Sequence, residues 1–212
     1  MKFHVKLLLT LCISFAFSAQ WVGINSNEPV EMEKTVLFSD IENTTVEFNL
    51  DGFWVNTVQI DGKEFSVVQV DGGSVMLEAG TPDLQKLTAS LIIPDEAHML
   101  SEVVSSEYVE FENYNLAPSK GNFTRDIMPE DVPYTFGSSY QTNAFFPGSL
   151  TDLGSAYVIR DFRGQPVHVY PFQFNPVTGV LRVYTQIVID VHTAEGIADN
   201  PKIRTEPLEV MD

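Results

Sequence analysis

The chain has 212 residues, of which 29 are Asp or Glu and 12 are Lys or Arg, so its formal net charge is −17 at pH 7. Such a charge repels phosphate backbones and anionic lipid headgroups, which argues against nucleic acid and acidic membrane surfaces as partners. A single cysteine, Cys12, excludes an internal disulfide. The length is sufficient for one domain with its own hydrophobic core.

The first nineteen residues have the order of a secretory signal peptide. Two lysines form a positive start, an apolar run follows from residue 7 to 17, and small residues end the segment at Ala19. The run is shorter than the roughly 20 apolar residues that a membrane-spanning helix needs. We therefore expect residues 1–19 to be removed on export to the periplasm, the cell surface or the medium. The mature chain would then have neither a membrane span nor a cysteine.

Three short runs rich in Val, Ile, Phe and Thr follow, at residues 44–50, 54–60 and 65–70. Each run ends at an Asp-Gly pair, which is a common hairpin turn. This pattern predicts three consecutive strands that form an antiparallel meander.

The middle of the chain predicts two more strands and then a long loop. Residues 87–93 and 101–111 have the composition and alternation of strands. Residues 113–133 hold three prolines and mixed charges without a sustained period. Loops of this length are uncommon in compact domains and are often functional, so we expect this loop to carry the function.

The last third returns to strand patterns at 156–161, 167–174 and 180–191, and residues 192–212 turn polar and contain proline. Many short strands at this spacing are typical of a sandwich or a barrel. We predict an all-β fold, an antiparallel β-sandwich (jelly-roll-like) over residues 20–191 with one long functional loop. Residues 192–212 are expected to be a polar linker.

Catalytic chemistry is not evident in the sequence. The four histidines have no metal-ligand spacing, and there is no Gly-rich phosphate loop or Gly-x-Ser-x-Gly elbow. Carboxylates are so numerous that a glycosidase-like pair is a weak signal. We expect no catalytic residue, no metal site and no cofactor.

Aromatic residues leave open a second, non-enzymatic interpretation. Exposed aromatic rings on a β-scaffold can bind sugars, although aromatic residues at alternating strand positions more often belong to the core. The alternative function is therefore a stand-alone secreted carbohydrate-binding or adhesive β-sandwich. The rings in question are Trp54, Tyr134, Tyr140, Tyr157 and Tyr170.

From residue 75 to 191, a series of short blocks resembles the propeptide of gingipain-type secreted bacterial cysteine peptidases, with a looser match back toward Trp21. Any one block is weak, but their order and spacing together are specific. The blocks are EAGTPDL at 78–84, LIIP at 91–94, APSKG at 117–121, VPY at 132–134, FFPG at 145–148, IRDFRGQ at 159–165 and FNPVTGVLRVY at 174–184.

The resemblance implies a prodomain that packs on its cognate cysteine peptidase, holds it latent and assists its folding until proteolysis removes it. The catalytic His and Cys of such enzymes lie in a following domain. Residues 192–212 would then be the linker toward a missing peptidase domain, and the chain would be the front part of a cysteine-type endopeptidase precursor. A free-standing propeptide-like protein is the other possibility.

The resemblance also implies functional residues. In the family, a loop presents a basic side chain to the specificity pocket, and the matching place here is 120–126. Arg125 is the candidate inhibitory residue and Lys120 the alternate, because a guanidinium fork can pair bidentately with a pocket carboxylate. In the polar tail, Arg204 is the candidate processing site and Lys202 the alternate, because proteases cut unpacked backbone.

Overall fold

The structure, a computed structural model, describes residues 19–204, and within them the chain forms thirteen β-strands and two short 3-10 helices. The elements in chain order are β1 (Gln20–Gly23), β2 (Glu33–Ser39), β3 (Asn43–Asn49), β4 (Gly52–Ile60), β5 (Lys63–Gln69), β6 (Ser74–Val75), β7 (Gln85–Ile93), β8 (His98–Phe111), η1 (Pro129–Asp131), η2 (Ser138–Gln141), β9 (Thr151–Leu153), β10 (Tyr157–Ile159), β11 (Phe162–Val169), β12 (Phe172–Asn175) and β13 (Val180–Ala194).

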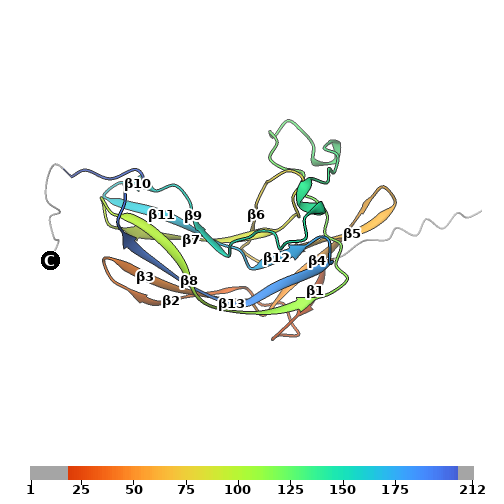
Figure 1. Cartoon of the computed structure of the whole chain (residues 1–212), viewed down its shortest axis with the longest axis horizontal. Helices are drawn as coiled ribbons and strands as arrows, with labels where there is room; N and C mark the ends of the chain where they lie inside the picture. The colour runs from red at the N-terminus through yellow and green to blue at the C-terminus, as the bar shows by residue number, and fades with distance from the viewer. Residues whose placement is uncertain (1–18, 205–212) are drawn as a thin grey trace, which may run out of the picture.

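The strands form three antiparallel sheets, of which two make the main layers. In the first, β13 lies between β8 on one side and β12 and β3 on the other, and β2 pairs with β3. In the second, β11 lies between β7 on one side and β9 and β10 on the other, and β6 pairs with β7. Strands β1, β4 and β5 form the third. Figure 1 shows the β7–β11 layer lying over the β3–β13–β8 layer.

One apolar core fills the space between the sheets. Phe53 of β4 packs edge-to-face on Phe111 and Phe172, with ring centroids 5.4 and 5.8 Å apart. Each large apolar side chain that is removed from water contributes about 1.5–3 kcal/mol. Members from the two main layers include Leu87, Val167, Val169, Phe174, Leu181, Ile187 and Ile189, all at most 1% exposed.

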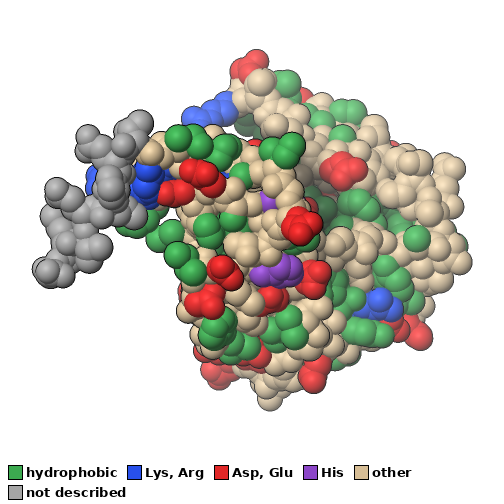
Figure 2. All heavy atoms as spheres, turned by 60° about the vertical axis from the view of Figure 1, so that its left-hand side comes forward, with side chains coloured by type: hydrophobic (Ala, Val, Ile, Leu, Met, Phe, Trp, Pro, Cys, Tyr) green, Lys and Arg blue, Asp and Glu red, His purple; other side chains and the backbone are tan. Residues whose placement is uncertain are grey.

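The expected all-β antiparallel sandwich is confirmed, and the expected strand segments other than 167–174 are found within a few residues of their predicted bounds. β13 ends at Ala194, three residues later than expected. Acidic side chains are scattered over the face in Figure 2, in keeping with the composition.

Two details of the strand prediction were wrong. The 44–50 and 54–60 runs do not pair, because β3 pairs with β13 while β4 pairs with β1 and β5. Of the three runs, only the second and the third, which form β4 and β5, pair as a hairpin. The 167–174 run is two strands, β11 and β12, because the chain moves from one sheet to the other at Tyr170 and Pro171. Proline cannot donate to a sheet ladder, which favours the break there.

The loop that was expected to carry the function is longer than its predicted range of 113–133. The whole connection between β8 and β9 spans residues 112–150, contains η1 and η2, and rises from one end of the sandwich (Figure 1). Among residues 19–204, no helix is long and apolar enough to cross a membrane.

Candidate functional site

The outgoing limb of the long loop is built into the sandwich. The backbone of Ala117 donates to the carbonyl of Ser66 in β5 at 2.9 Å and accepts from the amide of Asp83 at 2.9 Å. Ser119 donates to the carbonyl of Thr81 at 2.7 Å. Leu116 and Ala117 are fully buried. Residues 115–119 therefore behave as an extra strand between β5 and the 80–83 segment, and they fix the start of the loop.

The returning limb is fixed to the same place. Gly137 donates its amide to the carbonyl of Gly80 at 2.8 Å, and the hydroxyl of Tyr140 donates to the carbonyl of Leu116 at 2.9 Å. The ring of Phe136 lies 5.4 Å from that of Phe65 and 4.8 Å from that of Tyr140. Both limbs are thus anchored, and only the segment between them projects.

The projecting tip begins at Gly121, where the backbone leaves the sandwich. Gly121 has φ +81°, and a Cβ atom there would lie 2.7 Å from the Cβ of Ala79. Both facts favour glycine, because other residues are strained at positive φ and a side chain would collide with the layer below. The glycine that the sequence places between Lys120 and the candidate arginine therefore sets the direction of the tip.

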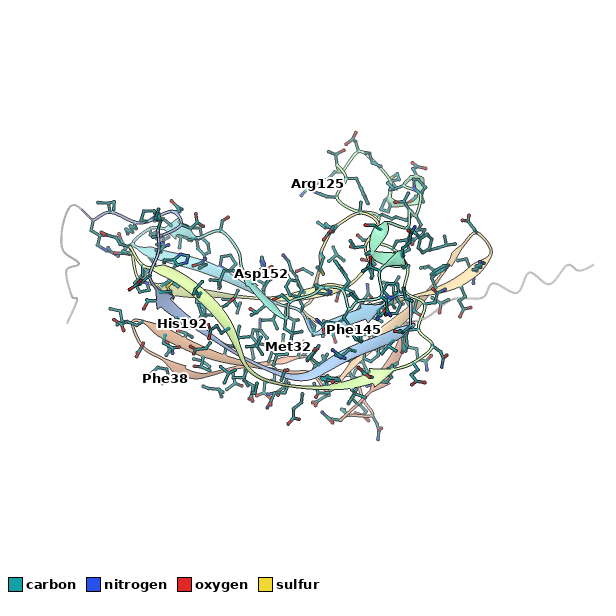
Figure 3. All side chains as sticks on the ribbon, in the orientation of Figure 1. Met32, Phe38, Arg125, Phe145, Asp152 and His192 are labelled. Atoms are coloured by element: carbon teal, nitrogen blue, oxygen red, sulfur yellow. The ribbon has the colours of Figure 1, made fainter. Side chains whose placement is uncertain are left out.

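Arg125 lies at the far end of the tip. Figure 3 shows its side chain away from the sheets, whereas Phe145 lies at the base of the loop. Between residues 19 and 204, no hydrogen bond or ion pair engages the guanidinium of Arg125, which is exposed. Its neighbours Ile127 and Met128 are also exposed, at 41% and 53%. The tip therefore offers a free cation beside apolar side chains.

A short turn shapes the backbone around Arg125. The amide of Ile127 donates to the carbonyl of Thr124 at 3.1 Å. The carboxylate of Asp126 accepts from the Thr124 side chain and from its own backbone amide, and these hydrogen bonds lower the pKa of Asp126. The charged carboxylate thus supports the turn, and the guanidinium at its apex remains available.

Lys120, the alternate candidate, is engaged within the protein. Its Nζ donates to the carbonyl of Pro129 at 2.7 Å and lies 4.3 Å from the ring centroid of Tyr134. From the sequence alone, Lys120 was the alternate to Arg125 for the inhibitory role. The structure separates them, because only Arg125 presents its charge outward.

A half-buried carboxyl group lies under the loop. Burial raises the pKa of Asp83. Burial also raises the pKa of Tyr134 and Tyr140, and the charge of Asp83 raises both further. The loop base therefore contains a carboxylate whose charged form is disfavoured by the fold.

A second constellation lies at the opposite end of the sandwich, where the C-terminal segment packs. The guanidinium of Arg163 is 1% exposed and donates to four backbone carbonyls. Two belong to the β7–β8 turn, Pro94 at 2.7 Å and Ala97 at 2.8 Å. Two belong to the C-terminal segment, Asp199 at 2.5 Å and Asn200 at 3.2 Å. Burial lowers the pKa of Arg163, and the nearby carboxylates oppose that shift.

The candidate processing residues lie on this docked segment. The side chain of Arg204 pairs with the carboxylate of Asp95 and donates to the carbonyl of Asp161 at 2.6 Å. Lys202 donates its amide to Asp95 O at 2.8 Å and its Nζ to Arg160 O at 3.0 Å. An unpacked tail was expected here, and its described part differs from that expectation because these contacts hold it. Residues 205–212 lie outside the described residues.

Sequence reasoning missed the role of Arg163 in joining distant segments. The signal was present in the 159–165 block, which places Arg160 and Arg163 beside a turn. A cation at such a place can satisfy backbone carbonyls, and Arg163 does so. Its four partners lie 36 to 69 residues away in the chain, so no local pattern could identify them.

Four of the five aromatic residues of the sugar-binding interpretation, Trp54, Tyr134, Tyr140 and Tyr170, have packing or hydrogen-bonding roles. Trp54 packs edge-to-face on Trp21 at 5.3 Å, and Tyr170 is 7% exposed with its hydroxyl on Asp152 at 2.6 Å. Tyr140 bonds to the loop base, as described above. In the range 19–204, no group of three or more His, Cys, Asp or Glu residues is placed to hold a metal ion.

Comparison with known families and sequences gives a consistent result. A family model described as Propeptide_C25 matches residues 27–207. Gingipain R2 of Porphyromonas gingivalis is 37% identical over 186 residues, which are 85% of this chain and 25% of the relative. Gingipain R1 of the same organism is 40% identical over 148 residues, 70% of this chain and 15% of the relative. The chain thus spans a quarter or less of the length of these relatives.

Solved structures show the same fold. The complex of the pro- and mature domains of Porphyromonas gingivalis RgpB matches with a TM-score of 0.77 and 36% identity, covering 82% of this chain and 90% of that one. A structure that describes the zymogenic latency of gingipain K from the same organism matches with a TM-score of 0.71. It is 18% identical and covers 84% of this chain and 100% of that one. At that identity, the second likeness concerns the fold alone.

Proposed function

Because the chain belongs to the Propeptide_C25 family, we propose that it is the prodomain of a gingipain-like cysteine peptidase. It binds the catalytic domain, holds it latent and assists its folding until it is cut away. The prodomain itself performs no catalysis. Its partner is the cognate peptidase domain, in the same precursor or in a separate chain.

The anchored loop that presents Arg125 carries this proposal. Both limbs are held by backbone hydrogen bonds to the sandwich, so only the tip between them has to be ordered when it enters a pocket. A free guanidinium suits the carboxylate of an Arg-specific pocket, because its planar fork can form two parallel hydrogen bonds. The exposed side chains of Ile127 and Met128 add apolar area beside it.

Titration tests the function. The chain from Gln20 to Asp212 is added to gingipain R2 and, separately, to Lys-gingipain, and cleavage of Arg and Lys peptide substrates is followed. We expect stoichiometric inhibition of the Arg-specific enzyme. Inhibition of neither enzyme, together with binding to glycans, would favour the adhesive alternative.

Substitution of Arg125 tests whether this residue carries the inhibition. Arg125→Ala should weaken inhibition roughly 30- to 1,000-fold, which corresponds to about 2–4 kcal/mol for a central interface arginine. Lys63→Ala is the matched control, since Lys63 is an exposed cation at the start of β5 and lies outside the 112–150 connection. Equal inhibition by Arg125→Ala and by the unchanged chain would refute the assignment.

Release is proposed to follow cleavage after Arg204, with cleavage after Lys202 as the alternate. The contacts of Arg204 with Asp95 and Asp161 mean that the segment must undock before a protease can bind it. Mass spectrometry of the fragments made by an Arg-specific peptidase identifies the bond. Fragments that end elsewhere would dispose of this assignment.

Export is proposed on the order of residues in the N-terminal segment 1–19, which lies outside the described residues except for Ala19. The prediction is a mature chain that begins near Gln20 in the periplasm, at the cell surface or in the medium. Intact mass of the chain recovered from these fractions tests it. A cell-associated chain that retains Met1 would contradict it.

A further inference from the structure

Lys120 occupies a special place in the loop, at the point where the anchored limb becomes the projecting tip. Its ammonium reaches across the loop to the carbonyl of Pro129, the first residue of η1, at 2.7 Å. The same carbonyl accepts from the amide of Val132 at 3.4 Å. One side-chain hydrogen bond therefore joins the two limbs and closes a ring of residues 120–129.

The ammonium is itself held in place. It lies 4.3 Å from the ring centroid of Tyr134, in the geometry of a cation–π contact. Tyr134 packs against the small apolar cluster of Ile60, Phe65 and Ala117. The link from the tip to the sandwich thus runs from Pro129 through Lys120 to Tyr134 and that cluster.

Apart from the Lys120 hydrogen bond, few contacts hold the projecting tip on the sandwich. Residues 124–131 are all exposed, and the Thr124–Ile127 turn and the η1 turn organise it only locally. Without the Lys120 bond, the tip would be joined to the sandwich by its two ends alone, and its conformational freedom would increase. A loose tip binds a pocket less tightly, because ordering it costs free energy at the moment of binding.

We propose that Lys120 is a positioning residue of the inhibitory loop. By bonding to the Pro129 carbonyl it closes the 120–129 ring and holds Arg125 at the apex in one pose. This inference rests on the proposed inhibitory role of Arg125. It assigns Lys120 no direct contact with the peptidase pocket.

A fixed pose also explains how an arginine can enter an Arg-specific site without becoming a substrate. Cleavage requires that the bond after Arg125 adopt a near-attack geometry at the nucleophile. A ring closed by Lys120 limits the poses available to that bond. An opened ring can reach the reactive pose, so loss of Lys120 should convert the inhibitor into a slow substrate cleaved between Arg125 and Asp126.

The test uses the Gln20–Asp212 chain and gingipain R2. For each variant it measures both the inhibition of the enzyme and the cleavage of the loop. Lys120→Met keeps the aliphatic stem and removes the donor. It should weaken inhibition roughly tenfold or more and yield fragments cut after Arg125 by mass spectrometry. Lys120→Arg keeps a cation that can bond to the carbonyl and stack on Tyr134, and it should restore most of the inhibition. Lys63→Met is the matched surface control and should change neither reading.

A double substitution separates positioning from an independent contact. If Lys120 acts through Arg125, then Lys120→Met adds little to the loss already caused by Arg125→Ala. Full additivity of the two losses would overturn the inference, as would a Lys120→Met chain that inhibits like the unchanged one and stays intact. If Arg125→Ala alone has no effect, the inhibitory assignment of Arg125 fails, and this inference fails with it.

Folding is checked separately. Lys120 lies outside the core, so the thermal midpoint of Lys120→Met should lie within a few degrees of that of the unchanged chain. If it does not, Tyr134→Leu supplies the second variant, because it removes the aromatic ring and leaves the ammonium and the Pro129 carbonyl. This variant should show an intermediate loss of inhibition with some cleavage after Arg125. No loss and no cleavage would overturn the inference.

Discussion

Arg163→Met removes a buried guanidinium that holds four backbone carbonyls, and its effect can be worked out from the structure. Hydrogen bonds from a charged donor are each worth about 1.5–3 kcal/mol, so the gross loss for four is about 6–12 kcal/mol. Desolvation of the guanidinium offsets part of this, and the lowered pKa of Arg163 has burial as its main cause. Methionine refills much of the volume but supplies no donor.

The two ends of the cluster respond differently. The carbonyls of Asp199 and Asn200 can return to water if the C-terminal segment undocks. Those of Pro94 and Ala97 belong to the β7–β8 turn. The net destabilisation should therefore be about 3–5 kcal/mol, as for the loss of one partner from a buried charged group. For a domain of this size, about 2–4 °C per kcal/mol gives a fall in Tm of roughly 6–20 °C.

Urea unfolding followed by tryptophan fluorescence is the assay, since Trp21 and Trp54 pack together on β1 and β4. Hydrogen exchange at the Lys202 amide, which donates to Asp95, reports the docked segment. We expect both stability and protection to fall in Arg163→Met and neither to change in Lys63→Met. A loss below about 1 kcal/mol with the Lys202 amide still protected would refute the reasoning.

Three further changes have defined outcomes. Burial raises the pKa of Asp83, so its carboxyl favours folding at low pH, and that contribution is lost as the pH rises through the raised pKa. Asp83→Asn should therefore raise Tm at pH 7 by a few degrees, and the difference should shrink toward about pH 4. An unchanged Tm at both pH values would contradict this. Asp95→Asn frees the Arg204 side chain and should speed cleavage after it roughly fivefold in a mass-spectrometric time course; an unchanged rate would mean that the ion pair does not limit cleavage. Gly121→Ala should lower the free energy of unfolding by about 1–3 kcal/mol and weaken inhibition. Gly62→Ala is the control, because Gly62 also has positive φ but has open space around it, so it shows the effect of backbone strain without crowding. Equal losses of stability in the two variants would show that crowding at Gly121 is unimportant.

The sequence by itself determined the local structure and the family. Strand runs alternate over five to ten residues, and turns follow from Asp-Gly and Pro-containing pairs, so both can be read from neighbouring residues. Asp61 and Gly62, for example, both take positive φ in the β4–β5 hairpin that their pair predicts. The ordered blocks from 75 to 191 identified the propeptide family, and the 120–126 segment located the candidate loop.

Pairing between distant segments was decided only by the tertiary structure. The Asp51-Gly52 pair resembles the one at 61–62, yet β3 and β4 lie in different sheets, because β3 finds its partner in β13, about 140 residues away. No local signal records such a choice, since it depends on which apolar faces meet in the core.

The same reason explains why the roles of the basic residues could not be separated in advance. Lys120, Arg125, Arg163 and Arg204 all appear in the sequence as cations near turns. In the folded chain, Lys120 donates to the carbonyl of Pro129, and Arg125 stays exposed to solvent. Arg163 is buried among four carbonyls, and Arg204 pairs with Asp95. A side chain's role follows from the groups that the fold places within hydrogen-bonding distance, and those groups are distant in the chain.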